Sequence, residues 1–239
     1  MLEFRKSITN KIFIVLAVIF TFVYLLGYFL PIGIDKVEKL NYGQYFISAY
    51  TVATEFGFLL FAFIIAFFIN KEYSAKQILF YKLIGENVYS FFYKKILVLF
   101  IESLVCIIIG ITVISLIFND FTHYFLLIGL FTLIMLQYVL IIGTISIMFS
   151  NLLISIAISI VFWITSIIMV AINKSYFGIL APFEASNTMY VHLVNTLNSN
   201  EVFITSTDIV NLIAFFVILL IINVLVLTLC KRRWLKLGL

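Results

Sequence analysis

Six long apolar stretches occupy most of this 239-residue chain, and they constrain its fold more than any other feature. A spanning helix needs about 20 apolar residues to cross a hydrocarbon core about 30 Å thick. Runs such as Ile12–Phe22 are apolar on every face, whereas the strands of a membrane barrel alternate apolar and polar residues. We therefore expect an all-α integral membrane protein with six transmembrane helices, at residues 12–30, 51–70, 96–118, 124–149, 153–172 and 209–230.

The composition favours the same class. The chain is 64% hydrophobic and 11% charged, whereas a soluble domain has about 45–50% apolar and about 25% charged residues. No segment between the spans suffices for a soluble domain, so residues 1–239 are expected to form a single transmembrane domain. The abundance of Ile, Phe, Lys and Asn is typical of AT-rich bacterial genomes, so we expect a multi-pass protein of a bacterial cell membrane.

The distribution of Lys and Arg predicts the orientation. Of the 15 basic residues, three precede the first span, five lie in the segment 71–95 and four follow the last span. The other side holds only Lys36, Lys39 and Lys174. Because basic loops stay in the cytoplasm, both termini are expected inside. The net charge of +4 then reflects topology and contact with anionic lipid, and no basic surface remains for nucleic acid.

Two segments outside the spans have an amphipathic pattern. At the N-terminus, Phe4 and Ile8 are four apart among charged residues, which favours a helix lying in the headgroup plane, with a disordered basic flank as the alternative. Residues 173–208 contain Phe183 and Val191 among several apolar positions, and they predict one or two short interfacial helices. A structureless loop of this length would be unusual unless it were functional.

Motifs for catalysis and nucleotide binding are missing. There is no glycine-rich phosphate loop, no His-Glu-x-x-His and no Gly-x-Ser-x-Gly. Cys106 and Cys230 lie inside or at the end of spans and are expected to pack as small apolar residues. His123 and His192 fall in outside loops and are expected to be surface or interfacial residues and not catalysts. We therefore predict no catalytic residue, no metal site and no cofactor.

The segment 70–95 is the most informative part of the basic side. It is amphipathic, and Gly85 is placed to end one helix and begin another. Short amphipathic helices at a membrane surface can dock into a groove on a partner.

This segment resembles the signature of ABC-2 type transporter permeases. In that family an acidic residue ends the second span and a lysine opens the third, and these positions fall on Glu72 and Lys95. The family's Gly-Thr pair falls on Lys76-Gln77, its Pro on Gly85 and its Ser-Arg on Asn87-Val88, so the two charged ends fit and the middle departs. The architecture is similar too, and the size suggests the small Gram-positive permeases of bacteriocin or lantibiotic immunity and of amphipathic-peptide export.

The resemblance implies a set of partners. Two permease subunits, identical or different, would pair in the lipid bilayer, and separate cytoplasmic ATPase subunits would bind ATP and dock beneath the segment 71–95. The residues that it implies for this contact are Glu72, Tyr73, Lys76, Gln77, Leu79, Lys82, Gly85 and Lys95.

Three polar residues fall within or near the ends of the predicted spans. Glu102 lies about two turns into the third span, Glu55 near the outer end of the second, and Gln137 in the fourth. A carboxylate in lipid is costly and marks a functional hypothesis, although both glutamates can instead face other helices or water. Gln137 and Asn223 are expected to hydrogen-bond between helices.

The function expected from the sequence is export of an amphipathic peptide from the membrane. Few intramembrane polar groups are present to replace the hydration of a hydrophilic solute, whereas a substrate already in the bilayer avoids that cost. Lipid, polysaccharide or drug export follows the same physics. An intramembrane enzyme using Glu102 or Glu55 and a scaffold or receptor without transport are the rival classes.

Overall fold

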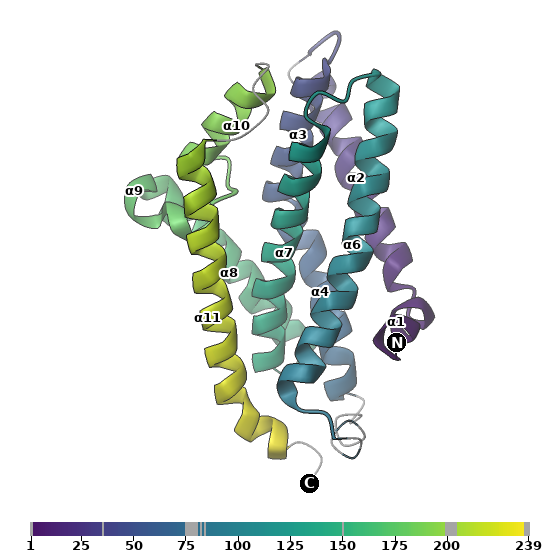
Figure 1. Cartoon of the computed structure of the whole chain (residues 1–239), viewed down its shortest axis with the longest axis vertical. Helices are drawn as coiled ribbons and strands as arrows, with labels where there is room; N and C mark the ends of the chain where they lie inside the picture. The colour runs from purple at the N-terminus through teal and green to yellow at the C-terminus, as the bar shows by residue number, and fades with distance from the viewer. Residues whose placement is uncertain are drawn as a thin grey trace.

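The computed structural model describes residues 2–34, 36–74, 81, 83, 85–149, 151–198 and 205–236, and every regular element in this part is helical (Figure 1). Helices of 21 residues or more are α2 (Ile12–Gly33), α6 (Val88–Phe118), α7 (Tyr124–Met148), α8 (Leu152–Ile172) and α11 (Ser206–Lys236). The shorter elements are α1 (Leu2–Thr9), α3 (Tyr42–Glu55), α4 (Gly57–Ser74), α9 (Lys174–Phe177), the 3-10 turn η1 (Gly178–Leu180) and α10 (Thr188–Asn198). The expected all-α class and the short helices within 173–208 are confirmed.

The second expected span is a bent pair of helices. In the described part of the chain, five helices are each long and apolar enough to cross a membrane, and α3 with α4 makes a sixth crossing if the pair counts as one span. The two helices meet at Phe56 with a bend of 50°. Helix α3 begins nine residues before the expected span 51–70, because the side chain of Asn41 accepts from the Gln44 N–H, and Gln44 accepts in return from the Asn41 N–H. This capping box begins the helix at Tyr42.

The break between α3 and α4 is stabilised from α7. Tyr138 Oη donates to the carbonyl oxygen of Ala53 at 2.8 Å and lies 3.3 Å from that of Thr54. These carbonyls end α3, where the regular helical pattern is interrupted, so the tyrosine supplies a donor for them. As a consequence, Glu55 lies at the break within the bent pair, whereas the sequence placed it near the outer end of the second span.

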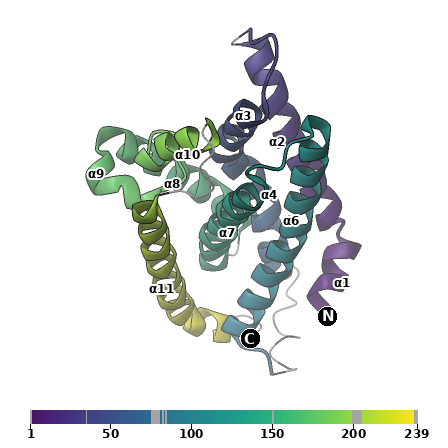
Figure 2. The ribbon, with the colours of Figure 1, turned by 45° about the horizontal axis from the view of Figure 1, so that its top comes forward.

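Helix α7 lies at the centre of the bundle. It packs against α4, α6, α8 and α11. In an 18-residue apolar stretch of α7, 61% of the residues are buried, whereas the corresponding share is 28% in α8 and in α11. The outer faces of α8 and α11 therefore expose mainly isoleucine, leucine and valine side chains. Figure 2 shows α11 to one side of the bundle, with α8, α9 and α10 near the N-terminal end of α11.

Helices α2 and α3 approach closely where Gly27 faces Ala49. A Cβ at Gly27 would lie 2.8 Å from the Cα of Ala49, so only glycine fits at this contact. Small residues permit the same kind of close approach between other membrane helices.

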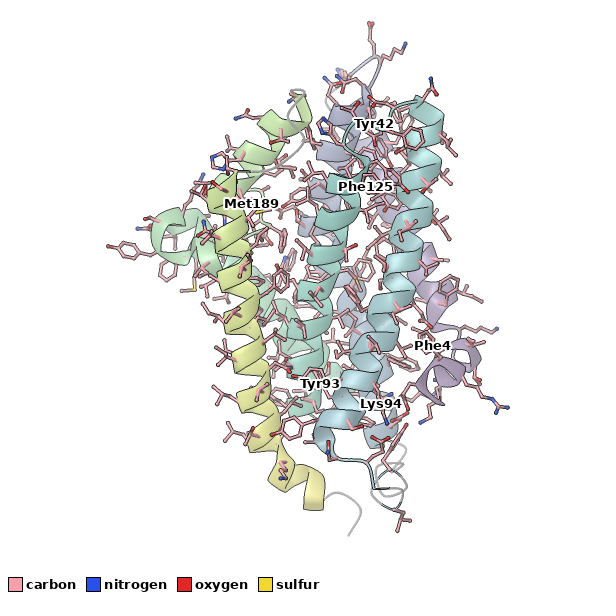
Figure 3. The ribbon with its side chains drawn as sticks, viewed as in Figure 1. Phe4, Tyr42, Tyr93, Lys94, Phe125 and Met189 are labelled. Atoms are coloured by element: carbon pink, nitrogen blue, oxygen red, sulfur yellow. The ribbon has the colours of Figure 1, made fainter. Side chains whose placement is uncertain are left out.

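A polar seam joins α11 to α6 and α7. Tyr93 Oη donates to Asn223 Oδ1 at 2.7 Å, and Asn223 Nδ2 donates to Thr144 Oγ1 at 2.7 Å. Tyr93 extends from α6 toward α11 in Figure 3. The expectation that Asn223 bonds between helices is confirmed. Gln137 is also buried, but its Oε1 has no hydrogen-bond partner among the described residues.

The two chain ends lie at the same end of the bundle. Helix α1 and the last turns of α11 are both found there, together with the connection between α4 and α6 (Figure 1). Lys11 separates α1 from α2 and has a left-handed conformation with φ 57°. The chain therefore turns at Lys11, and α1 packs against α6 as well as α2.

Candidate coupling site

A cluster of charged side chains ties α1, α4 and α6 together at the end of the bundle that holds the N-terminus. Lys95 Nζ of α6 lies 3.2 Å from Glu72 Oε1 of α4 and 3.1 Å from Glu3 Oε2 of α1. Lys6 Nζ of α1 lies 2.7 Å from the same oxygen of Glu72. Two lysines therefore face two carboxylates, and the formal charges within the cluster balance.

Tyr81 joins this cluster from the segment between α4 and α6. Its hydroxyl lies 2.7 Å from Glu3 Oε1 and 2.9 Å from Glu72 Oε1, and it also pairs with Lys6. The Lys6 ammonium lies 4.3 Å from the centre of the tyrosine ring. Position 81 is therefore connected to α1 and to α4 at once, so displacement of Tyr81 would disturb both helices.

Burial makes the cluster sensitive to any change in its charges. The side chain of Lys95 is 1% exposed, that of Glu72 5% and that of Glu3 8%. Lys95 also donates to the carbonyl oxygen of Phe68 at 2.9 Å and lies 4.1 Å from the centre of the Phe68 ring. An ammonium held in this way is stable only while its carboxylates stay in place.

The buried face of α1 is polar. Ser7 lies one turn beyond Glu3 and is fully buried, and its hydroxyl donates to Glu102 Oε2 of α6 at 2.7 Å. Phe4 and Ile8, which were expected to share a helix face, differ in burial: Ile8 is 70% exposed, while Phe4 packs against the core. Glu102 therefore faces α1 and has a hydrogen-bond donor there, which fits the plainer of its two expected roles.

The structure places only some of the sequence-predicted coupling residues. Glu72 and Lys95, far apart in the chain, form an ion pair. The other described members are Tyr73 in α4 and Gly85, which has φ 80°. The predictions for Lys76, Gln77, Leu79 and Lys82 fall outside the described residues.

Gly85 forms the turn that leads into α6. The N–H of Glu86 donates to the carbonyl oxygen of Tyr81 at 2.9 Å, the six-to-one bond typical of a Schellman motif around a left-handed glycine. Asn87 then caps α6 by accepting from the N–H of Ser90 at 2.8 Å. The expected third span, 96–118, thus begins eight residues earlier as a helix, at Val88.

A small cavity opens beside the charge cluster. Its volume is about 170 Å³, and Phe4 of α1 and Lys94 of α6 are among the residues that line it, together with Tyr81 and Glu86. Figure 3 shows Phe4 and Lys94 at this end of the bundle. Lys94 pairs with Glu86, and bonds from Lys94 and Ser90 lower the pKa of the Glu86 carboxyl.

Sequence reasoning missed the part of Glu3, Lys6 and Tyr81 in this site. Glu3 and Ser7 are four residues apart in the sequence and therefore share a helix face. The sequence does not indicate which other helix that face would contact. His123, which was expected at a surface or interfacial position, is 4% exposed in the turn between α6 and α7. His192 pairs with Asp208 at 2.8 Å between α10 and α11.

The described residues hold no group of three or more His, Cys, Asp or Glu side chains that could hold a metal ion. Cys106 is buried and Cys230 is half-buried, and neither forms a disulfide. The charged groups of this site are instead paired with one another across three helices.

Comparison with known proteins identifies the family. The model of the Peptide export permease protein YydJ family matches residues 1–239. The chain belongs to this family. It is 55% identical over 238 residues to the probable peptide export permease protein YydJ of Bacillus subtilis (strain 168), covering 100% of this chain and 99% of the relative. No solved structure matches the chain.

Family membership confirms the expectation of an exporter permease, and the chain is a multi-pass membrane protein of bacterial type. It also favours a transport subunit over the rival intramembrane enzyme. The charge cluster at Glu72 and Lys95 is thus a feature of a permease.

Proposed function

We propose that this chain is the membrane subunit of an ATP-driven exporter that moves an amphipathic peptide out of the bilayer. The match of the whole chain to a peptide export permease family supports this proposal most directly. All 239 residues then serve as one transmembrane domain. The cargo is a toxin-like peptide, handled either as export of a self-made product or as immunity to it.

The end of the bundle with α1 and the last turns of α11 faces the cytoplasm in this proposal. The support is the gathering of 12 of the 15 basic residues at the N-terminus, the segment 71–95 and the C-terminus. Helix α1 then lies at the level of the lipid headgroups, with Arg5 and Ile8 outward and Glu3 and Ser7 toward the protein.

Separate ATPase subunits bind ATP and dock beneath the segment 71–95. The observation that carries this step is the cluster of Glu3, Glu72 and Lys95, because it joins the two ends of that segment to α1. When the ATPase subunits move this segment, α4, α6 and α1 move together, because separating the buried charges that connect them costs much free energy. The permease itself needs no cofactor.

A second permease subunit, identical or different, completes the pathway. The exposed apolar faces of α2, α8 and α11 support contact with lipid and with such a subunit. Glu102 serves within this subunit as an acceptor for α1, and Gln137 is buried with an oxygen that has no partner among the described residues.

Co-purification and coupling test this function. The chain, expressed with an ATPase subunit encoded beside it, is expected to hold that subunit on a tagged-permease column and to raise its ATP hydrolysis when an amphipathic peptide is added. Glu72→Ala is expected to abolish the stimulation while the permease still inserts. Purification of the chain alone, with hydrolytic activity of its own, would contradict the proposal.

A further inference from the structure

A second polar site lies at the break between α3 and α4, toward the opposite end of the bundle from the charge cluster. Glu55 is the last residue of α3, and Glu184 belongs to the segment between η1 and α10. Tyr50 Oη donates to the carbonyl oxygen of Phe183 at 2.7 Å and holds this segment against α3. Asn187 secures the same segment by donating to the carbonyl oxygen of Ala181 at 3.1 Å.

Glu184 is buried without a full set of partners. It is 4% exposed, and its Oε2 has no hydrogen-bond partner among the described residues. Burial, followed by the nearby carboxylate of Glu55, raises the pKa of Glu184 to about 8. No described Lys, Arg or His lies within 4 Å of either carboxylate, so the pair has no counter-ion in this part of the chain. An unpaired buried carboxylate is costly unless a ligand or a proton satisfies it.

The other groups around Glu184 are neutral. Tyr50 of α3 and Tyr138 of α7 lie near it, and the indole of Trp163 from α8 lies beside it. Tyr190 of α10 packs against Tyr50. The site thus offers aromatic walls and two carboxyl groups, which is the environment that favours an organic cation.

A groove of about 420 Å³ adjoins this pair on the surface of α3. Its lining residues include Pro31 at the end of α2, Thr51 and Phe56 of the α3–α4 pair, and Tyr190 of α10. Glu55 lies one helical turn beyond Thr51 on the same face, and Thr51 bonds to Tyr190 at 3.0 Å. The residues that line the groove are mainly apolar, and Glu55 directly precedes the lining residue Phe56 in the chain.

We propose that the groove and the Glu55–Glu184 pair bind a positively charged amphipathic peptide, with apolar side chains along the groove and an ammonium group at the carboxylates. This inference rests on the proposed export of a peptide and specifies the chemistry of the cargo. Charge complementarity selects the occupant, since an apolar groove alone accepts any lipid tail, whereas a pair of carboxyl groups with no basic partner among the described residues favours a cation.

The test uses Trp163 as a reporter. The chain has two tryptophans, so Trp234→Phe leaves Trp163 beside Glu184 as the only one. The protein is placed in phosphatidylcholine nanodiscs and titrated with a helical Leu/Lys peptide that carries a nitroxide quencher, and with a copy in which every lysine is acetylated. The cationic peptide is expected to quench Trp163 at a concentration about tenfold lower, as for one charge-assisted hydrogen bond.

Three variants decide the assignment. Glu55→Gln and Glu184→Gln are expected to remove the preference for the cationic peptide, and glutamine at 184 replaces a carboxyl that is mostly neutral already, so the fold is expected to persist. Glu38→Gln is the matched control, because it removes one exposed carboxylate from the connection between α2 and α3. It is expected to keep the preference.

The inference is overturned if the wild-type chain shows no preference, if both glutamine variants at 55 and 184 keep it, or if Glu38→Gln loses it equally. Displacement of the peptide by phosphatidylethanolamine, which carries the same ammonium group, would assign the site to lipid and also overturn it. Failure of the proposed function would be seen in a different measurement. In that case no peptide would stimulate ATP hydrolysis, whether or not the cationic peptide quenches Trp163 at a lower concentration than the acetylated one.

Discussion

Lys95 of α6 and Glu72 of α4 form a buried ion pair, with Nζ 3.2 Å from Oε1. The two residues bracket the connection that is proposed to meet the ATPase. Glu3 and Lys6 of α1 complete the cluster, so three helices meet at one set of charges. Movement of the segment 71–95 would therefore act on the packing of α1, α4 and α6 through this pair.

Lys95→Met is expected to destabilise the protein strongly. It leaves Glu72 and Glu3 with one lysine between them, and removal of one partner from a buried pair costs on the order of 3 kcal/mol. Lys94→Met is the matched control, because its side chain is 55% exposed and a surface pair contributes about 1 kcal/mol or less. Thermal unfolding in detergent measures both, and equal losses for the neighbouring lysines would contradict this account.

Tyr138→Phe is expected to weaken the break between α3 and α4. It removes the donor to the Ala53 carbonyl and leaves that buried oxygen unpaired, at a cost of about 1–3 kcal/mol. Tyr28→Phe, which alters a half-exposed ring, serves as the control and is expected to have little effect. Unfolding by heat or by denaturing detergent checks the difference, and an unchanged midpoint for Tyr138→Phe would show that the bend does not depend on this bond.

The protein is expected to lose stability as the pH rises toward 8. The pKa of Glu184 in the fold is about 8, above its ordinary value of 4.5. A carboxyl with a raised pKa stabilises the fold below its unfolded pKa, and this contribution is lost as the pH rises through the folded pKa. Unfolding temperatures between pH 5 and pH 9 are expected to fall for the wild-type chain and to fall less for Glu184→Gln. Parallel curves for the two would contradict the raised pKa.

Labelling of single cysteines checks the orientation. With Cys106 and Cys230 replaced, an impermeant thiol reagent is expected to modify a cysteine at the exposed position Ser175 in intact cells. A cysteine at the exposed position Lys231 is expected to react only after the membrane is opened. The opposite pattern would reverse the assignment of the basic side to the cytoplasm.

Hydropathy predicted the helices well but not their ends. Helix α6 begins at Val88 because Asn87 caps it, although the apolar stretch from which the span was predicted begins at residue 96. The break at Phe56 escaped prediction, since a donor from Tyr138 is needed to stabilise it and that contact is long-range in the chain. Local patterns fix the helical class, whereas caps and distant donors fix where helices start and bend.

Some residues of the candidate coupling site were predicted from the sequence and others were not. Glu72 and Lys95 followed from a family pattern, and the structure brings them into contact. Glu3 and Ser7 were visible as polar residues on an otherwise mixed helix face, but their partners on α6 are set by the turn at Lys11. Glu184 gave no signal, because its burial depends on how the segment before α10 packs against α3.

Reconstituted transport tests the central claim most directly. The permease and its ATPase, placed in vesicles with the ATPase outside, are expected to move a fluorescent amphipathic peptide into the lumen when ATP is added. The Glu72→Ala complex, and the wild-type complex with a non-hydrolysable ATP analogue, are expected to leave the peptide outside. Equal accumulation with and without ATP hydrolysis, or ATP-driven movement of lipid alone, would contradict the account of this chain as a peptide export permease.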